Sequence, residues 1–216
     1  MSIGEEIYNK ITLKGTIESE VEFSHRVYGE EFIKFELSVV RTSGFKDIIP
    51  ITVSKRLIGR SELSRGDYIY IEGQIRTYNR FTDGKNRLLI TAFVRELEKV
   101  DKYEFEVDEN YVFLEGYICR EPYFRVSPRG REITDIMLAV NRMYGKSDYI
   151  PCIAWGRNAR YAGLLDIGTK VRITGRIQSR EYSKKIDEDN YIIRTAREIS
   201  IHKIEEISIN SDIIIP

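Results

Sequence analysis

Apolar and polar residues alternate with a period of two along most of the chain, which is the pattern of β-strands with one buried face. The alternating runs are rich in Val, Ile, Tyr, Phe and Thr, and they are bounded by Gly, Asn and Asp. In the N-terminal half the pattern predicts strands at 10–17, 32–41, 48–53, 68–80 and 87–97, with a helical turn at 56–63. In the C-terminal half it predicts strands at 111–119, 133–142, 149–155, 170–182 and 191–204, with a short helix at 157–165.

This order of elements occurs twice, with the helix between the third and fourth strands each time. It is the order of the oligonucleotide/oligosaccharide-binding (OB) fold. We therefore predict an all-β chain of two tandem OB-fold barrels, each with five strands and one short helix. Such barrels bind oligonucleotides, oligosaccharides or proteins, so the fold alone does not give the function.

The two halves also repeat each other in sequence, at an offset of 101 or 102 residues. Residues 9–15 return at 110–116, residues 47–53 at 148–154, and residues 66–75 at 168–177. A repeat of this length indicates a duplicated domain, whereas periods of about 20 to 50 residues indicate solenoids or propellers. We expect an N-terminal OB-fold domain at 1–98, an acidic linker at 99–109, a C-terminal OB-fold domain at 110–207 and a short tail at 208–216.

Charge is balanced over the chain but not within it. The 34 Lys and Arg equal the 34 Asp and Glu, yet residues 110–185 hold 14 Lys and Arg against 7 Asp and Glu. A basic half can hold a phosphate backbone even when the whole chain is neutral. A merely solvated surface is the alternative interpretation.

Cysteine and histidine indicate neither a disulfide nor a metal site. Cys119 and Cys152 lie in apolar strand patterns and are expected to be reduced core residues. His25 and His202 have no Cys, His or Asp at ligand spacing, so we expect no metal and no cofactor. The first residues lack the basic and apolar regions of a signal peptide, and no apolar run has the length of a membrane span. A cytoplasmic, nucleoid-associated chain without a membrane partner is expected.

Arginines and aromatic residues share the outward face of two strands in the C-terminal half. Strand alternation places Arg172, Arg176, Arg180 and Tyr182 opposite the core positions of the fourth strand. It places Tyr149 and Trp155, the only tryptophan, opposite the core positions of the third. Unpaired bases stack on aromatic rings while cations follow the phosphates, and a duplex offers no free base faces. This face therefore predicts single-stranded nucleic-acid binding, and packing against a loop or a second subunit is the alternative.

Four segments of the C-terminal half resemble the bacterial single-stranded DNA-binding protein (SSB) family. They are Asn110-Tyr-Val-Phe-Leu-Glu-Gly116, Leu138-Ala-Val-Asn141, Tyr149-Ile-Pro-Cys-Ile-Ala-Trp-Gly-Arg-Asn-Ala159 and the run from Gly168 through Gly175 to Ser179. The chain is similar to a two-copy type of clostridial Firmicutes. The resemblance implies base stacking at Tyr144, Tyr149, Trp155 and Tyr182. The matching N-terminal residues, Ser43, Ile48, Ser54 and Arg80, are not aromatic, so reduced stacking is expected there.

The predicted nucleic-acid-binding set combines both halves. In the C-terminal half it is Tyr144, Tyr149, Trp155, Tyr182, Arg142, Arg157, Arg172, Arg176 and Arg180. In the N-terminal half it is Arg41, Arg56, Arg76, Tyr78 and Arg80.

The function expected from this set is non-catalytic binding and protection of single-stranded DNA in replication, recombination or repair. A tandem OB-fold scaffold for protein interaction, with weak nucleic-acid binding, is the alternative. An enzyme is not expected, because the acidic residues form no ladder suited to a metal, and Asp135 and Asp148 are interpreted as turn or capping residues.

The resemblance also bears on partners. Family members with one barrel per chain form homotetramers, so two barrels per chain imply a homodimer in which first strands pair. Pairing of the two copies within one chain, as a monomeric pseudo-dimer, is the alternative. The family's long acidic tail recruits replication and repair proteins. Replication or repair proteins are candidate partners here too, but residues Asn210 to Pro216 follow the last strand directly, so recruitment through a tail is not expected.

Overall fold

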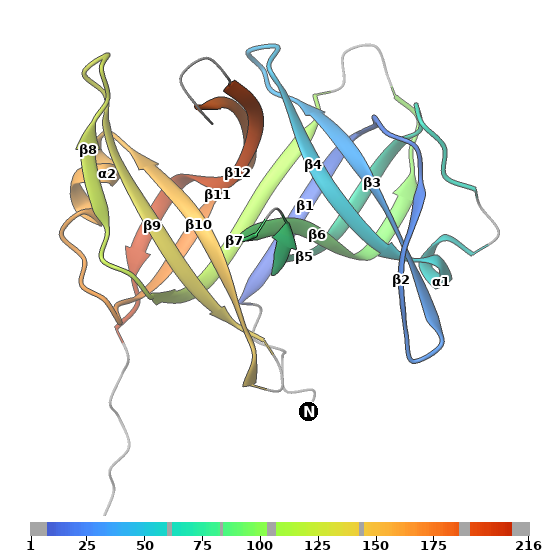
Figure 1. Ribbon diagram of the computed structural model, residues 1–216, viewed down its shortest axis with the longest axis horizontal. Helices are drawn as coiled ribbons and strands as arrows, with labels where there is room; N and C mark the ends of the chain where they lie inside the picture. Colours follow the sequence, from blue (N-terminus) through green and yellow to red (C-terminus); the bar gives the residue numbers. More distant parts are fainter. Residues whose placement is uncertain are drawn as a thin grey trace, which may run out of the picture.

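Each half of the chain closes into a small β-barrel, and the two barrels lie side by side (Figure 1). The computed structural model describes residues 8–59, 62–82, 84–102, 107–142, 145–185 and 191–208. The N-terminal barrel consists of β1 (Asn9–Ile17), β2 (Glu22–Val27), β3 (Glu30–Val40), β4 (Lys46–Ser54), α1 (Lys55–Ile58), β5 (Tyr68–Thr82) and β6 (Lys85–Lys99). The C-terminal barrel consists of β7 (Glu109–Ile118), β8 (Tyr123–Val126), β9 (Glu132–Asn141), β10 (Ser147–Trp155), α2 (Arg157–Ala162), β11 (Lys170–Lys185) and β12 (Tyr191–Glu206).

The strand pairing is the same in both barrels. In the first, β1 pairs with both β5 and β3, and a short parallel contact of β4 with β6 completes the closure. In the second, β7 pairs with β11 and β9, and β10 runs parallel to β12. Every predicted strand is present, and the prediction of two tandem OB-fold barrels is confirmed. Two strands were not predicted, β2 and β8, because they are mostly exposed and carry no buried alternation.

The alternation in sequence becomes an inside and an outside of each barrel. Along β11, Val171, Ile173 and Ile177 are completely buried, while Arg172 and Arg180 on the opposite parity are exposed. Burying such aliphatic side chains contributes about 1.5–3 kcal/mol each relative to leaving them in water. The predicted core face of this strand is therefore confirmed. The linker and domain boundaries stay a prediction, because residues 103–106 lie outside the described part of the chain.

The two barrels are joined by their first strands. Strand β1 pairs antiparallel with β7, so the sheets of both barrels are continuous across the middle of the molecule (Figure 1). The expected pairing of first strands is thus found within one chain, in the arrangement that the sequence left as the alternative. A dimer of chains would need a different surface.

Within each barrel, an asparagine side chain of the first strand extends the pairing with the long neighbouring strand where the backbone pairing ends. Asn9 accepts a hydrogen bond from the Ile75 N–H of β5 and donates one to the Ile75 carbonyl, both at 2.8 Å. Asn110 makes the same pair of bonds with Ile177 of β11, at 3.0 and 2.8 Å. The open edge of each long strand is therefore covered by an asparagine amide, which satisfies backbone groups that would otherwise invite pairing with another chain.

Candidate nucleic-acid interface

Three of the four predicted stacking residues stand exposed on the C-terminal barrel. Tyr149 begins the outward side of β10 with 51% of its surface exposed, and Trp155 ends that strand at 37%. Tyr182 lies on the outer part of β11 at 39%. Tyr144, the fourth, lies outside the described residues. Large aromatic side chains with this much free surface can offer ring faces to unpaired bases.

The exposed arginines of β11 and α2 differ in how closely each is paired with an acidic side chain of the protein. The Arg180 guanidinium lies 5.8 Å from the Tyr182 ring centroid and 3.6 Å from Glu198, so it remains an exposed cation beside an aromatic ring. Arg172 forms a close ion pair with Glu115, 2.6 Å from Nη2 to Oε1. Arg157, the first residue of α2, is exposed and has no acidic partner within the described residues. Arg180 and Arg157 are thus better placed to meet phosphates than Arg172.

Arg176 occupies a more enclosed position. Its Nη1 lies 3.2 Å from His202 Nε2, and its Nε is buried without a hydrogen-bond partner among the described residues. Burial lowers the pKa of Arg176, and the neighbouring positive charge of Arg41 acts in the same direction. A cation left incompletely satisfied in this way favours an anionic ligand.

Arg142 and Arg76 meet at one carboxylate. Asp148 is completely buried, and it receives bonds from Arg142 Nε at 2.6 Å and from Arg76 Nη1 at 3.0 Å. Its Oδ1 also accepts the backbone N–H of Thr77 at 2.6 Å. Burial alone would raise the pKa of Asp148, but these donors outweigh burial and hold that pKa below its ordinary value.

Asp148 is therefore a bridge between the barrels, since Arg76 and Thr77 belong to β5 of the other barrel. The sequence interpretation as a turn or capping residue missed this role. The signal was present in the repeat, because Asp47 and Asp148 are equivalent and each follows an arginine by six residues.

Asp47 makes the corresponding bridge on the other side. It is completely buried, binds Arg41 through two bonds of 2.6 Å, and accepts the Ser179 N–H of β11 at 2.7 Å. The Ile48 N–H in turn donates to the Ser179 hydroxyl at 2.9 Å. We call these two junctions the Asp47 seam (Asp47, Ile48 and Ser179) and the Asp148 seam (Asp148, Tyr149 and Thr77).

The remaining N-terminal candidates lie on β5 and α1. Tyr78 and Arg80 are exposed on the outer part of β5, next to the Asp148 seam. Arg56 projects from α1 on another side of the barrel, 3.9 Å from Glu30 and highly exposed. Ser54, at a position where the family stacks a base, is buried and caps α1 through the Arg56 N–H. The structure therefore brings Arg41, Arg76, Tyr78 and Arg80 toward the seams and leaves Arg56 apart.

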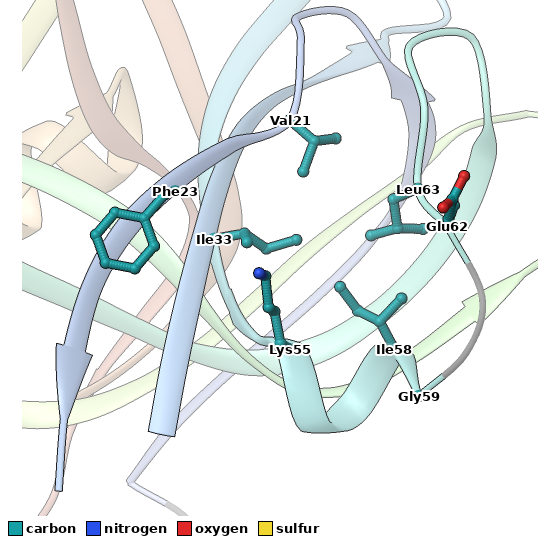
Figure 2. A pocket seen from close by; sticks show the side chains of 8 residues that line it. All are labelled: Val21, Phe23, Ile33, Lys55, Ile58, Gly59, Glu62 and Leu63. Atoms are coloured by element: carbon teal, nitrogen blue, oxygen red, sulfur yellow. The ribbon is translucent and has the colours of Figure 1, made fainter. Parts of the chain in front are cut away.

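The clearest hollows lie at the far ends of the barrels. In the N-terminal barrel a hollow of about 390 Å³ opens between β2 and α1, as Figure 2 shows. Its lining combines aliphatic, aromatic and charged residues, and it consists of Val21, Phe23, Ile33, Lys55, Ile58, Gly59, Glu62 and Leu63. A similar hollow of about 430 Å³ lies between 121–122 and 163–167 of the C-terminal barrel. Lys55 is already paired with Glu31 at 2.8 Å, so the first hollow lacks the convergent free polar groups of a small-molecule site.

The described residues hold neither a metal-binding cluster nor a membrane-spanning helix. No group of three or more His, Cys, Asp or Glu side chains there is arranged to hold a metal ion. Within the same residues, neither helix has the length and apolar character needed to cross a bilayer.

Two closed OB barrels with exposed aromatic rings beside arginines define a tandem OB-fold protein with a surface suited to single-stranded nucleic acid. Residues 109–205 match the model of the single-strand binding protein family. This half, 97 of the chain's 216 residues, is therefore similar to the proteins of that family.

Curated relatives carry the same family name. The chain is 33% identical over 90 residues to a single-stranded DNA-binding protein of Clostridium tetani, which is 38% of this chain and 62% of that protein. It is 32% identical over 83 residues to single-stranded DNA-binding protein A of Bacillus subtilis, covering 35% of this chain and 48% of that protein. The chain thus spans less than two thirds of the length of these relatives.

One solved structure resembles nearly the whole chain. The wild-type single-stranded DNA binding protein from Thermus aquaticus superposes with a TM-score of 0.74 at 18% identity, covering 93% of either chain. At that identity the likeness shows the fold, including the presence of two barrels, and nothing more specific.

Proposed function

We propose that this protein binds and protects single-stranded DNA in replication, recombination or repair, without catalysing a reaction. The observation that carries the proposal is the set of exposed rings on one barrel, Tyr149, Trp155 and Tyr182, with the Arg180 cation beside the last. Rings can stack on unpaired bases while arginines follow the backbone. The names of the curated relatives support the same substrate.

The DNA-binding residues we propose are those that the sequence analysis selected in both halves. Among them, Arg180, Arg157 and Arg176 serve the phosphates of the C-terminal barrel. Three other arginines of the set hold the two barrels together at the seams before they contact any DNA, because each is bound to a buried aspartate. They are Arg142, Arg76 and Arg41. We further place the protein in the cytoplasm, associated with the nucleoid.

Binding to oligo-dT and to duplex DNA of equal length tests the proposal. Fluorescence anisotropy of labelled DNA should show a much lower Kd for oligo-dT, because the bases of a duplex are not free to stack. Equal affinity for the two DNAs would contradict the proposal. Weak binding to both would favour the alternative role as a scaffold for protein interaction.

The stacking residues can be tested one at a time. Trp155→Ala and Tyr182→Ala should each weaken oligo-dT binding by about 1–3 kcal/mol. Tyr28→Ala is the matched control, because Tyr28 is fully exposed at the β2–β3 turn of the other barrel. An equal loss in Tyr28→Ala would show that the site is elsewhere.

For assembly, we propose a homodimer with four barrels in total. The first strands are already paired inside the chain, so the two chains would meet through another surface of the continuous sheet.

A further inference from the structure

The N-terminal barrel lacks aromatic residues at the family positions, but it carries exposed rings at others. Phe45 is 50% exposed in the turn between β3 and β4, and Tyr78 is 53% exposed on β5. Phe45 is not among the residues predicted from the sequence, because Ser43 is the residue that matches Tyr144 in the repeat. Both rings lie within two residues of a seam, where the N-terminal barrel meets the C-terminal one.

Phe45 is held in place by the Asp47 seam. The Arg41 guanidinium lies over the Phe45 ring at 4.6 Å from its centroid, and Arg41 is itself fixed by two bonds to the buried Asp47. The turn is closed by a backbone bond from the Arg41 N–H to the Phe45 carbonyl at 2.8 Å. Phe45 is therefore an ordered, exposed ring with a cation on it, and little further ordering is needed before a base can stack.

The same seam brings Phe45 next to residues of the proposed site. Asp47 binds the Ser179 N–H at 2.7 Å, and Arg180 and Tyr182 follow Ser179 on β11. The arginine–ring pair of the N-terminal barrel thus ends two residues before Asp47, and the arginine–ring pair of the C-terminal barrel begins directly after Ser179, its hydrogen-bond partner. The arginine–ring distances are 4.6 Å and 5.8 Å, respectively.

The Asp148 seam repeats this arrangement with the barrels exchanged. The Tyr149 N–H donates to the Thr77 hydroxyl at 3.0 Å, and Arg142 Nη2 donates to the Thr77 carbonyl at 3.1 Å. Tyr78 is the next residue along β5. The exposed ring of Tyr78 therefore lies on β5, and β5 is hydrogen-bonded to β10, the strand that carries the exposed ring of Tyr149.

We propose that Phe45 and Tyr78 are stacking residues, and that a bound single strand crosses from the C-terminal to the N-terminal barrel at the two seams. This inference rests on the proposed function and adds to it. It assigns the N-terminal barrel its own aromatic contacts, at positions displaced from those of the C-terminal barrel. The ligand is single-stranded DNA long enough to leave one barrel.

Oligonucleotide length separates the two barrels in an experiment. One OB barrel occupies about 4–16 nucleotides, so dT of about 10 nucleotides can be held by the C-terminal barrel alone and dT of about 40 cannot. In the Phe45→Ala/Tyr78→Ala variant, which removes two rings, the Kd for the long oligomer should rise roughly 30-fold or more, with that for the short oligomer nearly unchanged. Tyr28→Ala, another exposed ring of the same barrel, should change neither. An unchanged Kd for the long oligomer would overturn the inference.

A second variant reports base stacking at the seam through tryptophan fluorescence, so this test does not depend on a loss of affinity. In Phe45→Trp/Trp155→Phe the single tryptophan sits at the seam, and both positions stay aromatic. Its emission should be quenched by the long oligomer. Unchanged emission while anisotropy reports bound DNA would also overturn the inference. If the wild-type protein binds neither oligomer, the proposed function itself fails, which is a different outcome from either of these.

Discussion

At the scale of single residues, the predicted arginines fall into two kinds. Arg142 and Arg41 are each bound to a completely buried aspartate, so their charge is already used in holding the barrels together. Arg180 is half-exposed and only loosely paired. Sequence alternation shows which arginines point outward, but it does not show which of them has a buried acidic partner.

This division predicts different results for two substitutions. Arg180→Ala should flatten the dependence of log K on log salt by roughly 0.7, because one phosphate contact is lost. Arg142→Ala should change that slope less than Arg180→Ala does and should lower the free energy of unfolding by about 3–5 kcal/mol, because Asp148 stays buried with fewer partners. Salt titrations and urea unfolding of both variants measure the two effects. The same slope change in both would show that Arg142 meets the backbone as well.

At the scale of elements, the repeated glycines mark where strands approach too closely for a side chain. Gly73 and Gly175 lie where the register of the long hairpins shifts. A Cβ on Gly175 would lie 2.2 Å from the Ser200 carbonyl oxygen, and one on Gly73 would lie 2.2 Å from that of Phe93. Both contacts involve backbone that cannot move away without breaking the barrel.

Gly175→Ala should therefore destabilise the protein by roughly 1–3 kcal/mol or more, as overpacked sites do. Gly163→Ala is the matched control. Its Cβ would meet its nearest neighbour, the Ala159 carbonyl oxygen, at 3.3 Å, and its backbone is helical. Thermal unfolding compares them, and equal loss in both variants would contradict the assignment of Gly175 to a close strand contact.

The Asp148 seam adds a pH-dependent link between β10 and β5. Because the pKa of Asp148 is lowered in the folded protein, its contribution is complete above the unfolded value of about 3.9 and is lost as the pH falls through the folded value. Asp148→Asn should be less stable than the wild type at pH 7, and the difference should shrink below pH 4. Urea unfolding at several pH values checks this. A difference that stays constant down to pH 2 would contradict it.

The alternation predicted the long strands well because each buries one face in its own barrel. It did not show which outward positions and which polar side chains the folded protein covers. Gln178 and Ser179 on β11 are both buried, although alternation places Gln178 outward. Ser179 is covered by the Asp47 hairpin, and the Gln178 amide is bound to Glu198 at 2.9 Å. Contacts between residues 131 or 132 positions apart leave no period in the sequence.

At the scale of the whole molecule, the duplication places two barrels in one chain and pairs them through their first strands, as in a dimer of single barrels. The junction of β1 with β7 and the two seams relate the barrels by an approximate twofold arrangement. The copies then differ in their surfaces, since the C-terminal one keeps rings at the family positions and the N-terminal one does not. Sequence comparison finds this difference, but only the fold shows that Phe45 and Tyr78 lie at the junction.

The proposed assembly predicts a particle with twice the mass of one chain. Light scattering at micromolar concentration measures it. A mass of one chain at all concentrations would show that the internal pseudo-dimer is the whole assembly. A mass of four chains would contradict the count of four barrels.

The most direct test of the central claim uses the only tryptophan. Trp155 lies on the proposed stacking face and is partly exposed, so a stacked base should quench its emission. Titration of the wild-type protein with oligo-dT should give saturable quenching, and a duplex of equal length should give little at the same concentrations. Unchanged Trp155 emission at saturating oligo-dT, with binding confirmed by anisotropy, would contradict the claim that this face holds the bases.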